Sequence, residues 1–299
     1  MTVIVNTNVQ SLVAQKNLSS STNALNTATQ RLSTGMRINQ ASDDAAGLYI
    51  AKGIESQLRG SQQCQNNIAL GVNVLQIAEG DLSTIQDNVM RIKDLATQAA
   101  NGINSTDARN AMANEVQQRV NEINRISSAS NFNGTNLLDG SNNNLSSMRL
   151  QVGAGSDSSA NAIFVNGVFT KSDAQGIGLV SSSNTYSTDA AGNTVSSDIT
   201  ANFASATAAA TFIKTCSDTL TNISTKRANI GVVQNRLQAA DDGLATTIQN
   251  LSAAKSTVMD TDIAATTADY TKNQILQQIS ASMLSAANQA PSIALSLIH

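Results

Sequence analysis

The stretch that decides the fold runs from Ile223 to Val258 and reads ISTKRANIGVVQNRLQAADDGLATTIQNLSAAKSTV. Its apolar residues recur every seven positions, at Ile223, Ile230, Leu237, Leu244, Leu251 and Val258. Apolar residues at this spacing, sustained over about five heptads, predict one long helix with a coiled-coil seam. Because a helix with one apolar stripe must bury it against another apolar surface, the chain has to supply a partner.

A second seam of the same period lies nearer the N-terminus. It comprises Ile68, Leu75, Leu82, Val89 and Ala96, with a companion row at Ala78, Ile85, Ile92 and Ala99. We therefore expect two long helices to lie side by side across an intrachain seam formed by Ile68, Leu75, Leu82, Val89, Ile230, Leu237, Leu244 and Leu251. The sequence predicts a mainly α fold: an elongated antiparallel helical bundle or coiled coil from both termini, with a small β-hairpin region in the middle.

The composition excludes several functional classes. The chain has 299 residues, a net charge of −3 and 13% charged residues, so it carries no basic footprint for nucleic acid. No apolar run is long enough to span a membrane, and the N-terminus lacks the basic and apolar regions of a cleaved signal. We therefore expect no membrane contact, and a chain that stays in the cytosol or leaves by a route without a cleaved signal.

Catalytic and metal chemistry are excluded on similar grounds. His299 is the only histidine, which removes Ser-His-Asp, Cys-His and His-rich metal sites. With no P-loop or dinucleotide fingerprint either, we expect no enzyme activity and no cofactor. If residue 50 lies near residue 252 in the antiparallel pair, the two thiols of Cys64 and Cys216 fall roughly 30 Å apart, too far for a disulfide.

Both ends of the chain predict amphipathic helices with few charges. Residues 1–33 and 263–290 carry apolar stripes that include Val9, Leu12, Leu18, Leu25, Leu32, Ile275, Ile279, Met283 and Leu284. A solvated helix face usually carries charge, so these faces are expected to be buried against other protein. Gly35 is expected to cap the first helix, and residues 34–42 to form a connector.

The intervening chain alternates helical and turn signals. Ser42 is expected to cap a helix that runs to Ala100, and a third helix is expected to start near Ser105. Asn133-Gly134 is a hairpin-turn dipeptide, and the apolar runs 148–152 and 163–169 look like strands. The returning helix is expected from Ala206 to Met259.

Residues 181–204 are rich in Ser, Thr, Asn and Asp and read as a short surface loop. Four of its hydroxyl residues are candidates for O-glycosylation: Ser181, Ser182, Ser183 and Thr185. A plain exposed loop without glycans explains the same composition equally well.

Several motifs resemble those of the bacterial flagellins over nearly the whole chain. They are Asn6-Thr-Asn8, Arg31-Leu-Ser-Thr-Gly-Met-Arg-Ile-Asn39, Ala41-Ser-Asp-Asp-Ala-Ala-Gly-Leu-Tyr-Ile-Ala51, Phe132-Asn-Gly134, Arg227-Ala-Asn-Ile-Gly231, Gln234-Asn-Arg-Leu237 and Ala287-Asn-Gln-Ala-Pro291. Any one alone is weak, but together they are specific. The resemblance implies a structural subunit that self-assembles into the helical flagellar filament for motility, with terminal segments that become ordered on polymerisation.

The resemblance also implies a domain plan. Residues 1–43 with 257–299 would form the inner filament-core domain, whose stripe residues named above would make the subunit-assembly core. Residues 44–180 with 205–256 would form an outer-shell helical domain with β-hairpins. Only the loop 181–204 would lie in the variable region, so large outer domains are expected to be absent and the filament surface bare.

Partners follow from the resemblance as well. They are further copies of this chain, an export chaperone of the flagellar type III apparatus, filament cap and junction proteins, and a flagellin-sensing Toll-like receptor. The receptor-binding residues implied by the motif are Arg91, Leu95 and Glu115, while Lys93 and Asp94 replace the commoner Arg and Glu. The implied location is the extracellular flagellar filament.

Three other readings compete with a filament subunit. A hook–filament junction protein of the same axial family shares the terminal pattern. An enzyme carried on a helical scaffold is opposed by the absence of a His-Glu-x-x-His motif and by the short middle region. A generic coiled-coil adaptor would fold at both termini as a monomer.

Overall fold

The structure is a computed structural model that describes residues 7–140, 147–181, 186–188 and 194–296. The chain divides into two compact units: residues 60–247 form one, and residues 1–59 with 248–299 form the other. Helices α2 (Ala45–Ala99) and α6 (Ala206–Met259) continue from one unit into the other. Each unit has its own buried apolar cluster. The mainly α fold expected from the heptads is confirmed.

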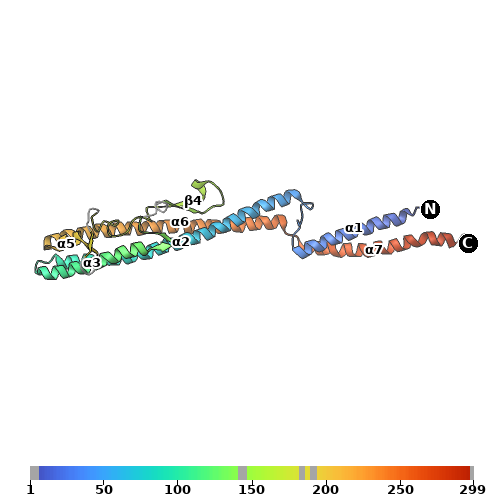
Figure 1. Cartoon of the computed structure of the whole chain (residues 1–299). Helices are drawn as coiled ribbons and strands as arrows, with labels where there is room; N and C mark the ends of the chain where they lie inside the picture. Colours follow the sequence, from blue (N-terminus) through green and yellow to red (C-terminus); the bar gives the residue numbers. More distant parts are fainter. Residues whose placement is uncertain (1–6, 141–146, 182–185, 189–193, 297–299) are drawn as a thin grey trace. The chain divides into compact units, whose positions relative to one another are not determined.

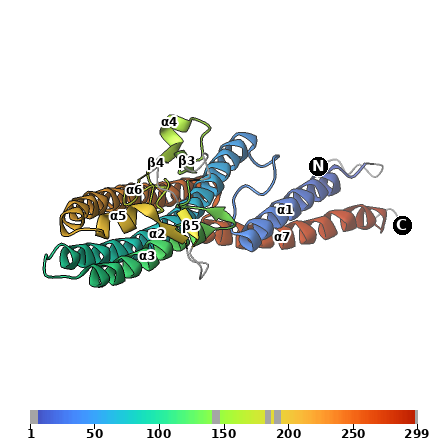
Figure 2. The ribbon, with the colours of Figure 1, turned by 60° about the vertical axis from the view of Figure 1, so that its left-hand side comes forward.

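Three long helices form most of the unit of residues 60–247. α2 and α6 lie side by side, and α3 (Thr106–Ala129) folds back along α2 (Figure 1 and Figure 2). Arg227 of α6 contacts Gln86 of α2, and Arg91 of α2 contacts Glu115 of α3. α3 is capped as expected, because the Ser105 side chain accepts a hydrogen bond from the Ala108 N–H.

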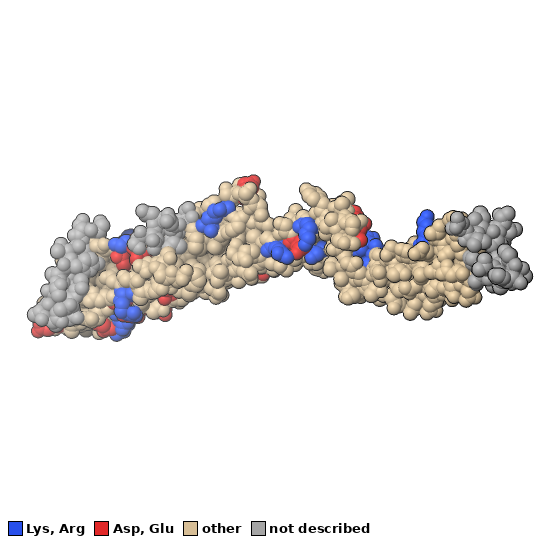
Figure 3. Space-filling model, turned by 45° about the vertical axis from the view of Figure 1, so that its right-hand side comes forward, with Lys and Arg blue, Asp and Glu red and all other residues tan. Residues whose placement is uncertain are grey.

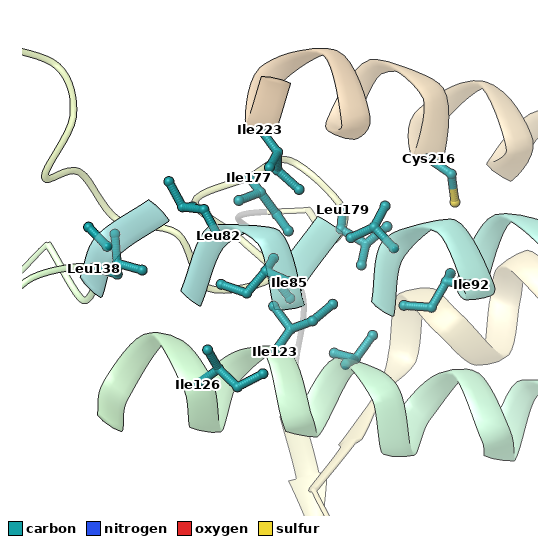
Figure 4. Packing of buried hydrophobic residues seen from close by; sticks show 14 of the residues in the cluster. Leu82, Ile85, Ile92, Ile123, Ile126, Leu138, Ile177, Leu179, Cys216 and Ile223 are labelled. Carbon is teal, nitrogen blue, oxygen red and sulfur yellow. The ribbon is translucent and has the colours of Figure 1, made fainter. Parts of the chain in front are cut away.

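The predicted seam residues of α2 and α6 are mostly buried in the core of this unit. Of the eight, the structure buries Ile68, Leu75, Leu82, Val89, Ile230 and Leu237 and leaves Leu244 and Leu251 half-buried. Figure 4 shows that the core has more than two sides, because Ile85 of α2 lies against Ile123 of α3. The segment after β4 fills the remaining space with Ile177 and Leu179. This core therefore packs three helices and an irregular segment rather than a two-helix coiled coil.

The described strands form three antiparallel pairs. β1 (Asn131–Phe132) pairs with β2 (Thr135–Asn136), β3 (Ser147–Gln151) with β4 (Ala162–Asn166), and β5 (Tyr186–Thr188) with β6 (Thr194–Ser196). In the first turn Asn133 and Gly134 have φ of 50° and 76°, the left-handed conformation that favours this dipeptide. A four-residue helix, α4 (Ser158–Asn161), connects β3 to β4.

The prediction of a surface loop over 181–204 was wrong for its described residues from Tyr186 to Phe203. There the structure has strands β5 and β6 and a short helix, α5 (Ser197–Phe203). Ile199 and Phe203 of α5 are each only 1% exposed, and the Phe203 ring packs edge-on against Phe212 of α6 at 5.9 Å. Because these two apolar residues stand alone in a polar stretch, no periodic pattern revealed the helix.

The second unit contains the two terminal helices, α1 (Val9–Thr34) and α7 (Ile263–Ser296), which lie side by side. Gly35 caps α1 as expected: its φ is 71°, and its N–H donates to the Arg31 carbonyl. The connector after it is tied to the end of α6 by a bridge between Met36 and Asp260. Ile38 is buried there beside Met259.

The predicted cap of α2 was displaced by two residues. Asp44, rather than Ser42, accepts from the Gly47 N–H, at 2.9 Å. Asp43 instead accepts hydrogen bonds from the Asn39 and Gln40 N–H groups, which lower the pKa of its carboxyl. Both aspartates therefore order the connector and the helix start. Among the described residues, no helix combines the length and the apolar character needed to cross a membrane.

Candidate assembly surface

The contact between α1 and α7 is made largely by small side chains. Ala14 and Ala28 of α1 and Ser280 and Ala287 of α7 are buried. Small residues allow two helix backbones to approach closely, since no long side chain holds them apart. The most deeply buried side chains of this pair are therefore small ones.

Polar side chains fix the register of the pair. The Asn8 amide donates to the Ala287 carbonyl oxygen at 2.7 Å and also caps α1 by accepting from the Ser11 N–H. The Ser11 hydroxyl donates to the Asn288 side chain at 2.7 Å. At the middle of the pair the Gln277 amide donates to the Thr22 hydroxyl at 3.1 Å. The two helices are thus held in one alignment within a single chain.

Large apolar side chains remain on the outside of this pair. Those that are exposed are Val9, Leu12, Val13, Ile263, Ile275, Leu276, Ile279 and Met283. An open groove of about 530 Å³ runs among them and is lined by Val9, Val13, Ala14, Met283 and Ala287. So many exposed large apolar residues on one helix pair are typical of a surface that contacts another protein.

The predicted stripe residues fall into two sets. Val9, Leu12, Ile275, Ile279 and Met283 are exposed, whereas Leu18, Leu25, Leu32 and Leu284 are half-buried. The second set is partly used within the chain, so only the first is wholly available to other subunits. Leu276, which also belongs to the predicted C-terminal stripe, is exposed as well. Val13 is exposed too, and it was missed because it stands directly beside the stripe residue Leu12.

Charge is scarce on these helices. Lys16 and Arg31 are the only charged residues from Val9 to Thr34, and none occurs from Asn273 to Leu297. On the face seen in Figure 3 the described surface over α1 and α7 is almost free of coloured, charged side chains. Burying such a surface therefore desolvates few ions, which keeps the electrostatic cost of association low.

Comparison with known proteins identifies the family of the chain that carries this surface. The bacterial flagellin N-terminal helical region matches residues 5–143, and the bacterial flagellin C-terminal helical region matches residues 213–298. The chain belongs to the bacterial flagellin family. Its expected resemblance is confirmed, and the two matched regions include the helices that carry the exposed apolar surface.

Relatives match this flagellin from end to end. The flagellar filament 30.7 kDa core protein of Treponema maltophilum is 37% identical, with 96% of each chain covered. Flagellin FlaB2 of Treponema pallidum is 35% identical, covering 99% of this chain and all of the relative. A putative flagellar hook-associated protein of Vibrio parahaemolyticus, 18% identical, covers 73% of this chain and 99% of its own at a TM-score of 0.51, a likeness of fold alone.

The structure brings two of the three receptor candidates of this flagellin together. Arg91 of α2 and Glu115 of α3 form an ion pair at 3.1 Å, and Arg119 also donates to Glu115. Desolvation raises the pKa of the Glu115 carboxyl, but the hydrogen bonds from Arg91 and Arg119 outweigh it and lower that pKa. Leu95 is only 3% exposed and belongs to the core, so its side chain is not available for direct contact.

Only one of the four candidate O-glycosylation residues lies in the part of the chain that the structure describes. Ser181 is exposed, and its N–H donates to the Asp198 carboxylate. Ser182, Ser183 and Thr185 lie outside the described residues. Within the described ranges no group of three or more His, Cys, Asp or Glu residues could hold a metal ion.

The thiols are separate in the part of the chain that the structure describes. Cys64 and Cys216 are both free and buried. Cys216 of α6 lies near Lys93 of α2. Lys93 follows Cys64 on α2 by 29 positions, or roughly 40 Å of helix, so the two thiols are far apart.

Proposed function

We infer that this flagellin is a structural subunit that self-assembles into the bacterial flagellar filament. The observation that carries the proposal is the exposed apolar surface of α1 and α7 in a chain whose relatives are filament core proteins. Full burial of one Val, Leu, Ile or Met side chain stabilises a complex by about 1.5–3 kcal/mol, so covering several of them favours association. The function is mechanical rather than catalytic.

The assembly we propose is head-to-tail. A contact between two different patches of the same chain does not close on itself, so it produces a helical polymer rather than a dimer. The pairing of α1 and α7 within one chain buries mostly small residues, so it stabilises the terminal helices only weakly. We expect these helices to become fully ordered when neighbouring subunits cover Leu12, Ile279 and Met283.

Within the filament we assign residues 1–43 with 257–299 to the inner core and residues 44–180 with 205–256 to the outer shell. The connectors support this plan, since both lie at helix ends: α2 begins at Ala45 and α6 ends at Met259. With only a short segment between Val180 and α5, the outer surface would be bare of large domains. Such a filament lies outside the cell.

Export is proposed to use the flagellar type III route without a cleaved signal. Support comes from α7, whose apolar residues and lack of charge beyond Asn273 would need covering before assembly. A dedicated export chaperone that binds α7 would meet that need, and cap and junction proteins would contact the same surfaces at the two filament ends. Co-purification of α7-truncated and full-length chains with the chaperone tests this proposal.

Receptor recognition is proposed to involve Arg91 and Glu115. The two side chains are partly exposed and fixed by their ion pair, so they present a defined charged surface on α2 and α3. Leu95 would support this surface from beneath. A reporter-cell assay in which Arg91→Ala monomer signals as strongly as the unaltered chain would refute the role of Arg91.

O-glycosylation of the 181–185 segment is also retained as a proposal, supported by the exposure of Ser181. Intact-mass measurement of filaments sheared from the source cells decides it. A mass equal to that of the bare chain would remove the proposal.

Seeded polymerisation, imaged by electron microscopy, tests the main proposal. The intact chain is expected to give long filaments, and a variant lacking residues 1–33 none. Met283→Asp should also fail, because a charge replaces an exposed apolar contact, while Met283→Leu should polymerise normally. Short capped rods from the intact chain would favour the hook–filament junction protein, and filaments from the truncated chain would overturn the role of α1.

A further inference from the structure

The turn between α2 and α3 presents an isolated apolar side chain. Ile103 is 86% exposed, the most exposed of the large apolar residues in the described part of the chain. Its turn is not loose: the Asn104 amide donates to the Gln98 carbonyl at 2.6 Å, and Arg109 donates to the Asn104 carbonyl at 2.7 Å. An ordered turn therefore holds the side chain out in solvent. This exposure is unfavourable in free energy, because it keeps an apolar group in contact with water.

A groove in the same unit is left open by the described side chains around it. It has a volume of about 410 Å³ and lies between α2, the β1–β2 turn and β3. Its apolar lining consists of Leu70, Val74, Phe132, Leu137, Met148 and Leu150. Gly71 lets β3 approach α2 closely at its floor, since a Cβ there would lie 2.7 Å from Leu150. Leu70 on its edge is 53% exposed.

Ile103 cannot reach the groove of its own chain. Both belong to the unit of residues 60–247, and Gly71 is separated from Ala99 by 28 positions of continuous helix, or roughly 40 Å. In Figure 1 the α2–α3 connection lies at one end of this unit, well away from the β3–β4 hairpin. A projecting apolar side chain and a distant groove on one molecule are the components of a head-to-tail contact.

We propose that in the filament the α2–α3 turn of one subunit inserts Ile103 into the groove beside β3 of the next subunit. This inference rests on the proposed assembly and adds a second contact, outside α1 and α7. Successive subunits in such a row would be displaced along α2 by at least about 40 Å. The turn enters as a unit, with Ile103 as its anchor, because the groove is larger than one side chain.

Charge at the two surfaces favours a second copy of this chain as the occupant. Arg149 lies on the groove and is exposed. Asp107, in the first turn of α3 beside Ile103, is also exposed and has no ion-pair partner among the described residues. Docking of the turn brings an acidic residue toward a basic one, which sets orientation and register more than affinity.

Cross-linking in assembled filaments tests the contact directly. The variants are Ile103→Cys, Leu70→Cys and the double variant, each treated after polymerisation with a short bismaleimide cross-linker. The native thiols do not interfere, because Cys64 and Cys216 are buried. The double variant is expected to give a ladder of covalent oligomers, since each copy offers both groups, and each single variant is expected to give none.

Other outcomes overturn the inference. Covalent dimers from Ile103→Cys alone would show that two turns meet each other. Filaments of the double variant that give no ladder would remove the contact and leave the proposed function intact. If the unaltered chain forms no filament at all, both the proposed function and this inference fail.

A polymerisation assay gives a second, independent measurement. Ile103→Asp is expected to stop elongation, and Ile103→Ala to raise the critical concentration about tenfold. Ile103→Leu, which keeps an apolar group of the same size, should elongate like the unaltered chain. Because Ile103 makes little contact in the monomer, circular dichroism should show all three variants folded. Normal elongation by folded Ile103→Asp would overturn the inference.

Discussion

Arg227 of α6 donates a hydrogen bond of 2.7 Å to the side-chain oxygen of Gln86 on α2, across 141 positions of sequence. The same guanidinium lies 3.7 Å from the carboxylate of Glu79, which precedes Gln86 on α2 by about two turns. These contacts define which residues of the two long helices face one another. The antiparallel alignment considered from sequence would place residue 75, not Gln86, beside Arg227.

The hydrogen bond between Gln86 and Arg227 should contribute modestly to the stability of the folded chain. We expect a double-mutant cycle of Gln86→Leu and Arg227→Met to give an interaction free energy of about 0.5–1.5 kcal/mol, because the bond is partly shielded from water. Urea unfolding of the monomer, followed by circular dichroism, measures it. Additive single effects would mean that the contact contributes nothing to the alignment of the helices.

The seam should dominate the stability of the unit of residues 60–247. Leu82 is fully buried, so Leu82→Ala should lower the free energy of unfolding by about 2–5 kcal/mol, through lost burial and the cavity left behind. Ile77 lies on the same helix but is 39% exposed, and Ile77→Ala should cost clearly less. Equal losses in urea unfolding would contradict the observed difference in burial.

Lys226 should give stability a measurable dependence on alkaline pH. Its ammonium donates to the Lys171 carbonyl and the Ser172 hydroxyl, each at 2.9 Å, and burial lowers its pKa from 10.5 to about 8 despite the opposing effect of Asp173. Between these two values the unfolded chain binds more protons at this position than the folded chain. The contribution of Lys226 to stability therefore rises with pH across this window.

The matched comparison uses two lysines of α6. Relative to Lys226→Met, the unaltered chain should become more stable between about pH 7.5 and about pH 10 in urea unfolding. Lys214 is exposed, and its hydrogen bond to Asp218 raises its pKa, so Lys214→Met should not reproduce that trend. A difference between Lys226→Met and the unaltered chain that is constant with pH would show that Lys226 titrates normally.

The two thiols should resist alkylation in the folded chain. Burial raises the pKa of Cys216 to about 12 and raises that of Cys64 by the same cause, so neither forms much thiolate at pH 8. We expect iodoacetamide to modify both slowly in the native monomer and rapidly in urea, with Cys216 the slower. The exposed thiol of Ile103→Cys serves as the fast reference. Native labelling of Cys216 at that reference rate would contradict its burial.

The helices were largely determined by the sequence alone. The returning helix occupies Ala206–Met259 as expected, Ser105 caps α3, and Asn133-Gly134 forms its turn. Each of these features depends on interactions between residues a few positions apart, such as a cap bond, a seven-residue spacing or a left-handed backbone conformation. Local patterns of this kind are visible in a linear sequence.

The tertiary structure decided which neighbour covers each residue. A heptad pattern looks the same after a shift of seven positions, so it could not place Gln86 beside Arg227. Spacing likewise could not separate exposed Leu12 from half-buried Leu18, because that depends on the small residues that draw α7 close. The burial of Leu95 and the groove between α2, the β1–β2 turn and β3 follow from packing between segments distant in sequence. Such contacts leave no periodic trace, since any apolar residue of suitable size can make them.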